Sequence, residues 1–186
     1  MQERENILRI LKETKQAVKQ EDSNWLRELS NQTIHTASIS QDADNIATAV
    51  IVYSLSKIVE RKDYRQYKDW NSFFKKLMLC IERAVQALEK KQDDYFRDQV
   101  ACVRKEIDSL SGKLKRNIQD VFEKARISKA SRIYEHGISM EQTAKLLGIT
   151  IWELAEYAGE TGISDVNLNI TIPEKQRIKN ILEFFK

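Results

Sequence analysis

Residues 70–89 read WNSFFKKLMLCIERAVQALE and carry the clearest helical pattern in the chain. Their apolar side chains recur three or four residues apart, which places them on one face of an α-helix. The stretch therefore predicts an amphipathic helix whose apolar face packs against other helices. The residues of that face are Trp70, Phe73, Phe74, Leu77, Ile81, Ala84, Val85 and Leu88.

A polar turn at residues 92–94 separates this helix from a second long pattern. Apolar residues follow nearly a heptad spacing from Phe96 to Ala125. Two long amphipathic helices joined by a short loop are expected to form an antiparallel hairpin. The heptad seam could instead lie along a partner chain.

Three shorter helices are predicted upstream of the hairpin. Residues 7–18 carry one narrow apolar stripe, and a second pattern covers residues 25–34. Residues 46–59 follow a cap at Asp42 or Asp44 and are apolar on nearly every side. This third helix is therefore expected at the centre of a bundle.

Turn-forming residues are scarce. The 186 residues include five glycines and one proline, and no glycine precedes Gly112. All-β and Rossmann-type folds need many tight turns, so this composition argues against both. We expect an all-α fold in which residues 1–127 form an N-terminal helical bundle that contains the long antiparallel hairpin.

The pattern changes after Ile127 to short helical segments punctuated by glycines. Residues 131–159 read SRIYEHGISMEQTAKLLGITIWELAEYAG. Ser139 and Thr150 each precede a Gln or Glu by three residues, which is the spacing of a capping box. Gly148 can supply the left-handed turn between the two segments. Residues 128–163 are therefore predicted to form a tri-helical helix-turn-helix.

Residues 128–165 resemble the helix-turn-helix of small prokaryotic antitoxin-like proteins of the UPF0175 type. The shared features are a Gly, a Ser cap, an Ala, and Leu-Leu-Gly-Ile followed by Trp-Glu-Leu. The overall layout is also similar to archaeal helix-turn-helix proteins of unknown function. The resemblance implies a role in binding nucleic acid or a protein partner, and it does not extend to residues 1–127.

The segment in the position of a recognition helix lacks the side chains that normally read DNA. Arg, Lys, Asn and Gln usually contact base edges, whereas residues 150–157 contain no base and two acids. The acids would face phosphates at close range, so direct sequence readout is not expected. Ile151 and Trp152 offer apolar surface instead, and they are candidates for docking a protein partner.

A basic stretch precedes this acidic module. Residues 113–132 contain seven bases and two acids, whereas residues 133–165 contain six acids and one base. The bases could hold the phosphate backbone of nucleic acid, although a solvated helix face explains the same charges. The candidate nucleic-acid-binding residues are Lys113, Lys115, Arg116, Lys124, Arg126, Lys129 and Arg132.

Residues 164–186 carry a strand pattern followed by Pro173, which can begin a terminal helix. A lone strand has unpaired backbone groups, and pairing with the same strand of a second copy would satisfy them. We therefore expect a strand–helix tail that forms a homodimer, with a segment extended over the surface as the alternative. The residues expected at the dimer contact are Val166, Leu168, Ile170 and Ile172.

Motifs for catalysis are missing from the sequence. It contains no Gly-rich phosphate loop, no His-Glu-x-x-His and no nucleophile elbow. His136 fits a helix C-terminus, where the dipole favours a cation, and His35 leaves a helical ribonuclease open as an alternative. Cys80 and Cys102 are interpreted as buried small residues that can approach each other. No catalytic residue, metal or cofactor is expected.

The chain begins without the basic and apolar regions of a signal peptide, and its most apolar segment is shorter than a membrane span of roughly 20 residues. A cytoplasmic location is therefore expected. We predict a non-catalytic regulatory or assembly factor, a homodimer that docks on a DNA operator or on structured RNA such as a ribosomal subunit. A protein-only adaptor or antitoxin-like partner is the alternative reading, and it would use the Trp152 face and a groove of the bundle.

Overall fold

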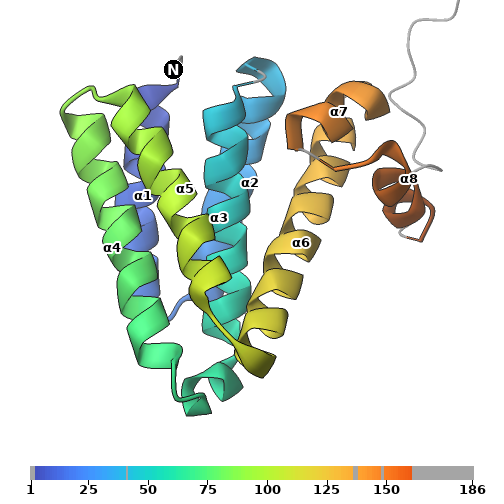
Figure 1. Cartoon of the computed structure of the whole chain (residues 1–186). Helices are drawn as coiled ribbons and strands as arrows, with labels where there is room; N and C mark the ends of the chain where they lie inside the picture. Colours follow the sequence, from blue (N-terminus) through green and yellow to red (C-terminus); the bar gives the residue numbers. More distant parts are fainter. Residues whose placement is uncertain (1–2, 41, 136–137, 148, 161–186) are drawn as a thin grey trace, which may run out of the picture.

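A computed structural model describes residues 3–40, 42–135, 138–147 and 149–160, and in this part of the chain the fold is all-α, as expected (Figure 1). It contains eight α-helices, one short 3-10 helix and no strand. In chain order they are α1 Arg4–Lys19, α2 Ser23–Ser40, α3 Ala43–Glu60, η1 Lys62–Gln66, α4 Trp70–Glu89, α5 Asp93–Ser109, α6 Gly112–Glu135, α7 Met140–Leu147 and α8 Ile151–Glu160.

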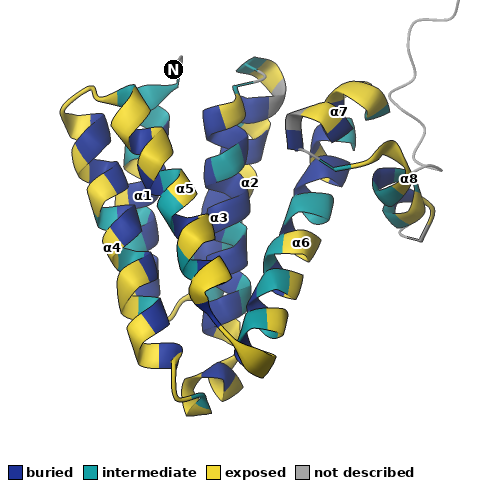
Figure 2. Cartoon of the chain, viewed as in Figure 1, coloured by how far each residue is buried: buried dark blue, intermediate teal, exposed yellow. Residues whose placement is uncertain are grey.

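Helices α1 to α5 form a bundle around one hydrophobic core. Consecutive helices pack as two hairpins, α2 with α3 and α4 with α5, and α1 contacts α2, α3 and α4. Helix α3 has buried residues on most of its circumference, as expected for a central helix, and Figure 2 shows the buried faces turned toward the interior of the bundle. The predicted α4–α5 hairpin is therefore confirmed.

The reversals after α1 and α4 share one motif. Glu21 and Lys91 adopt φ angles of 55° and 57°, in the left-handed region that glycine usually occupies. In the first turn, the next N–H, that of Asp22, donates to the carbonyl of Ala17 at 3.0 Å. Non-glycine residues thus close these turns, which explains how a chain without glycine before Gly112 reverses direction.

The predicted continuous helix from Phe96 to Ala125 is wrong. Helix α5 ends at Ser109, Leu110 is extended with ψ of 161°, and Gly112 begins α6 with φ of 60°. Leu110 is apolar and buried, so it fits the heptad spacing while its backbone leaves the helix. As a result α6 turns away from α4 and packs mainly along α3.

Cys80 and Cys102 join α4 to α5 through a disulfide, with their Cα atoms 6.0 Å apart. Cys80 is buried, as expected, and the prediction that the two residues approach each other is confirmed, but they are bonded to each other rather than two separate small residues. Closing a loop of this length typically stabilises a protein by about 3 kcal/mol. The bond reinforces the hairpin that the sequence predicted most clearly.

Helices α7 and α8 pack on each other and on the C-terminal half of α6. Ser139 Oγ accepts the N–H of Gln142 at 3.2 Å, and Thr150 Oγ1 accepts that of Glu153 at 3.1 Å. The Glu153 carboxylate in turn accepts the Thr150 N–H at 2.6 Å, and this bond lowers the pKa of Glu153. The capping residues predicted for both short helices are therefore confirmed.

A second hydrophobic cluster connects these short helices to the bundle. It unites residues of α2, α3, α6, α7 and α8, and the predicted boundary between residues 127 and 128 falls inside α6. The predicted tail at 164–186, including its dimer contact, lies outside the described residues, as does His136. No helix in the described ranges is long and apolar enough to cross a bilayer.

Candidate functional site

The seven predicted nucleic-acid-binding residues all lie on α6, but they do not share one exposed face. Lys115 and Arg126 are half-buried, and Lys129 is buried with 2% of its surface exposed. The exposed members are Lys113, Arg116, Lys124 and Arg132. The continuous basic stretch of the sequence is therefore divided among different environments in the fold.

Several of these bases hold neighbouring helices in place. The Lys115 ammonium donates to the carbonyl of Asp108 at the end of α5, at 2.8 Å. The Arg126 guanidinium donates to the carbonyl of Leu147, the last residue of α7, at 3.3 Å. Basic side chains commonly bind the free carbonyls at helix C-termini in this way, so both charges have a structural role.

Two exposed bases form ion pairs within α6. Lys124 lies 3.0 Å from Asp120, and Arg132 lies 3.0 Å from Glu135. Exposed pairs of this kind contribute typically 0.2–1 kcal/mol and remain available to exchange partners. The nearby carboxylates reduce the positive potential that a phosphate backbone would meet at these positions.

Ile151 and Trp152 lie in the first turn of α8, where 44% and 83% of their surfaces are exposed. Trp152 is the most exposed large hydrophobic residue in the described ranges. An indole with this exposure can anchor a protein contact because it supplies a large apolar area. The structure therefore places both predicted docking residues on the surface.

His35, the residue of the ribonuclease alternative, is exposed on α2.

The adaptor reading expects a groove in the bundle, but the sequence did not predict where the largest concave feature among the described residues lies. A groove of about 740 Å³ lies between α3, α5 and α6, with Leu147 of α7 at its edge. In Figure 1, α6 leans away from α3 and α5 as it approaches α7. The groove depends on the helix break before Gly112, because the chain reverses there and α6 runs back along α3. Gly112, the first glycine of the chain, is the sequence signal that could have indicated the break and therefore the groove.

Apolar side chains from four helices and polar or charged side chains of both signs contribute about equally to the exposed lining of this groove. Arg104, Asp108 and Glu123 are exposed, whereas Gln119 and Arg126 are half-buried. The apolar lining consists of Ala43, Ile46, Ala47, Val50, Ile51, Val100, Val103, Ile107, Phe122 and Leu147.

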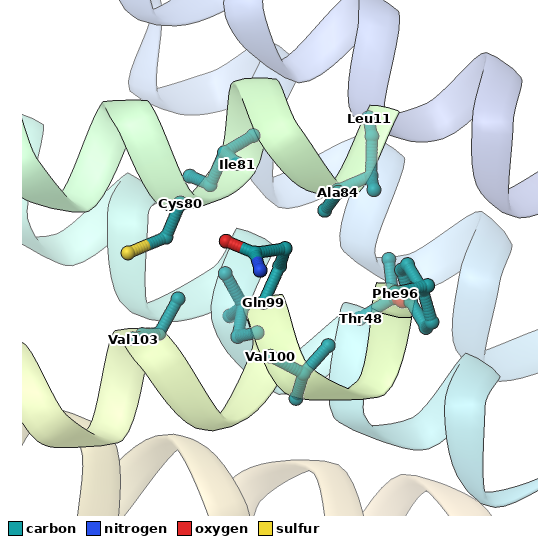
Figure 3. Close-up of a pocket in the computed structure, with 10 residues that line it drawn as sticks. Leu11, Thr48, Cys80, Ile81, Ala84, Phe96, Gln99, Val100 and Val103 are labelled. Carbon is teal, nitrogen blue, oxygen red and sulfur yellow. The ribbon is translucent and has the colours of Figure 1, made fainter. Parts of the chain in front are cut away.

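A smaller cavity beside the disulfide is too small to bind a substrate (Figure 3). Its volume of about 10 Å³ is close to the minimum for one water molecule. Gln99 projects from α5 into this region between Cys80 and Ala84 (Figure 3). The groove between α3, α5 and α6 is therefore the stronger candidate for a binding site.

The described residues contain no group of three or more His, Cys, Asp or Glu placed to hold a metal ion. Comparisons with known proteins found no matching family model, no similar curated protein and no similar solved structure. The chemistry of the groove and of the exposed residues is therefore the basis for the functional proposal.

Proposed function

We propose that this protein is a non-catalytic adaptor that binds an amphipathic helix of a partner protein in the groove between α3, α5 and α6. The observation that carries the proposal is the large groove between these helices, whose exposed lining is about half apolar and half polar. Helix-in-groove recognition uses such a surface to bury the apolar face of a partner helix. A partner helix in the groove would pack against the helices that border it. Packed helices usually lie with their axes about 8–10 Å apart.

The charged border of the groove supports the same occupant. Arg104 contributes positive charge and Asp108 contributes negative charge, whereas Arg126 and Glu123 lie 3.8 Å apart and partly neutralise each other. A partner helix with complementary charges beside its apolar face would be oriented by these residues. The border would therefore favour a protein helix of mixed charge over a uniformly anionic polymer.

Docking on nucleic acid through α6 is a second candidate, supported by the exposure of Lys113, Arg116, Lys124 and Arg132. It ranks below the adaptor because Lys115 and Arg126 bind helix-end carbonyls and Lys129 is buried. Helices α6, α7 and α8 with their capped ends would form the helix-turn-helix in either role. Ile151 and Trp152 would then give an adaptor a second contact surface.

The homodimer formed by the tail at 164–186 is tested by truncation at residue 163, for which we expect a monomer.

The adaptor proposal is tested with a matched pair of substitutions. Ala47 is half-buried in the groove, whereas Ala101 is exposed on α5 and does not line it. Fluorescence anisotropy would measure the binding of labelled amphipathic helical peptides, and separately of a peptide with the sequence of residues 173–186, to the full chain. We expect Ala47→Glu to weaken binding at least tenfold because it places a charge among apolar residues, and Ala101→Glu to leave binding unchanged.

Equal losses in the two variants, or no binding of any peptide, would overturn the groove as a helix site. Binding of the 173–186 peptide alone would make the tail of the chain the occupant, and would overturn the adaptor proposal. Circular dichroism of both variants would confirm that they retain the helical fold before the affinities are compared.

A further inference from the structure

Lys129 is a buried cation without a carboxylate partner among the described residues. Its ammonium donates to the side-chain carbonyl of Asn31 at 3.1 Å and lies 4.1 Å from the centre of the Tyr53 ring. Buried lysines are normally paired with acids, because removing an ammonium from water costs several kcal/mol. One amide oxygen and one aromatic face compensate only part of that loss.

The groups nearest to Lys129 add positive charge to the same place. Arg27 from α2 and Arg132 from α6 both act on Lys129 electrostatically and oppose its protonation. Burial, followed by these two charges, lowers the pKa of Lys129 to about 8. Arg27 lies four residues before Asn31 on α2, and Arg132 lies three residues after Lys129 on α6, so both arginines start on the helix faces that meet at the Lys129–Asn31 hydrogen bond.

Arg27 contains a second unsatisfied donor. Its Nε–H is buried and has no hydrogen-bond partner, although one terminal nitrogen lies 3.8 Å from the Glu60 carboxylate. A guanidinium does not lose its proton in proteins, so this donor persists at every physiological pH. A buried donor without an acceptor is unfavourable, so both Arg27 and Lys129 lack an acceptor or counter-charge.

The acids around the cluster do not neutralise it. Glu60 lies 2.9 Å from Lys57 as well as near Arg27, and Glu135 lies 3.0 Å from Arg132. Glu60 is therefore shared by Arg27 and Lys57, and Glu135 is paired with Arg132. The excess positive charge is centred on the buried lysine, which has no carboxylate of its own.

Packing alone explains part of this arrangement. The aliphatic stem of a lysine can fill apolar space, and its ammonium can stack on tyrosine. A methionine would fill the same space without the desolvation cost. Packing also leaves the unpaired Nε–H of Arg27 without an explanation. Strongly perturbed cations with unsatisfied donors are typical of binding sites.

We propose that Lys129, Arg27 and Arg132 form a binding site for a phosphate group, either as inorganic phosphate or as a small phosphomonoester. A phosphate has several acceptor oxygens, so it can receive bonds from donors on α2 and α6 at the same time. Arginine pairs with phosphate in a bidentate geometry, and the bound anion supplies the counter-charge that Lys129 lacks. Asn31 and Tyr53 position the ammonium through the contacts described above.

The site is tested on the full chain by thermal unfolding and isothermal titration calorimetry. Inorganic phosphate and phenyl phosphate are the probes, with chloride at matched ionic strength as the reference. We expect phosphate to raise Tm above the chloride reference. Lys129→Met and Arg27→Gln should each weaken the affinity at least tenfold. Lys124→Met is the matched control, because Lys124 lies on the same helix but is exposed and paired with Asp120, and it should retain the wild-type affinity.

The absence of any effect of either probe beyond chloride would overturn the proposal. Equal affinities in Lys129→Met and Lys124→Met would also overturn it, because binding would then be a general response to surface charge. If Lys129→Met does not fold, Arg27→Gln decides the question alone, since Arg27 is partly exposed. Binding of phenyl phosphate without inorganic phosphate would identify a monoester ligand, and the reverse result would identify the free anion.

Discussion

The α4–α5 hairpin and the α3–α6 pair are two antiparallel helix pairs with opposite characters. In the hairpin, the residues predicted for the apolar face of α4 are all buried except Phe74. A disulfide also joins the two helices of the hairpin. The α3–α6 pair instead borders a groove and buries an unpaired lysine. The hairpin buries its apolar face, as helix packing normally requires. The α3–α6 pair departs from that pattern at the groove and at Lys129, the two features that we associate with binding.

The largest difference between the hairpin and the groove should appear when a leucine is truncated in the hairpin core and at the edge of the groove. Leu77 is fully buried in the hairpin, and Leu147 is 8% exposed at the edge of the groove. We expect Leu77→Ala to lower the free energy of unfolding by about 4 kcal/mol and Leu147→Ala by about 2 kcal/mol, because a cavity costs less where the site can relax or admit solvent. Urea denaturation measures both, and equal values would contradict the comparison.

Reduction of the Cys80–Cys102 bond should produce the next largest effect. We expect reductant to lower the free energy of unfolding by about 3 kcal/mol, through the larger conformational freedom of the unfolded chain. A Cys80→Ala, Cys102→Ala double variant is the control, since its stability should not respond to reductant. An unchanged wild-type denaturation curve would show that the bond contributes nothing. Because disulfides are rare in reducing compartments, the thiol content of freshly isolated protein also bears on the expected cytoplasmic location.

Lys129 should give the α3–α6 pair a pH dependence that the hairpin lacks. Its pKa is about 8 in the folded protein against 10.5 in its ordinary state. Between these values the unfolded chain binds a proton that the folded chain does not bind, so stability rises with pH from about 8 to about 10.5. The rise approaches about 3 kcal/mol when the whole interval is crossed.

Comparison of the wild type with Lys129→Met isolates this contribution, because other groups titrate equally in both proteins. The difference in unfolding free energy between them should shrink as the pH increases, and the variant should be the more stable protein near pH 7. A difference that stays constant over this range would show that Lys129 keeps its ordinary pKa.

Local features of the fold could be predicted because they depend on residues close in sequence. The helical spacing of 70–88 and the caps at Ser139 and Thr150 depend on neighbours three or four positions away. Leu110 was missed for a related reason, since its apolar side chain satisfies the heptad while only its backbone leaves the helix. A heptad pattern cannot distinguish these two cases.

The binding features could not be predicted because they depend on contacts between distant segments. The groove exists because α6 leaves α5, and its lining comes from four helices. Lys129 was counted among the surface bases, yet its environment is made by Asn31, 98 positions earlier, and by Tyr53. Charge counted along the sequence does not distinguish a base on the surface from one buried between helices.

Methyl NMR of the full chain would test the central claim most directly, namely that the groove rather than the hairpin is the site of helix binding. An amphipathic peptide that binds would be titrated into protein labelled at Ile, Leu and Val methyl groups. We predict that the shifts concentrate at Val50, Val100 and Ile107, which line the groove, and leave Leu77 unchanged. Shifts centred on the hairpin core or on Ile151, with the groove methyls unaffected, would contradict the account.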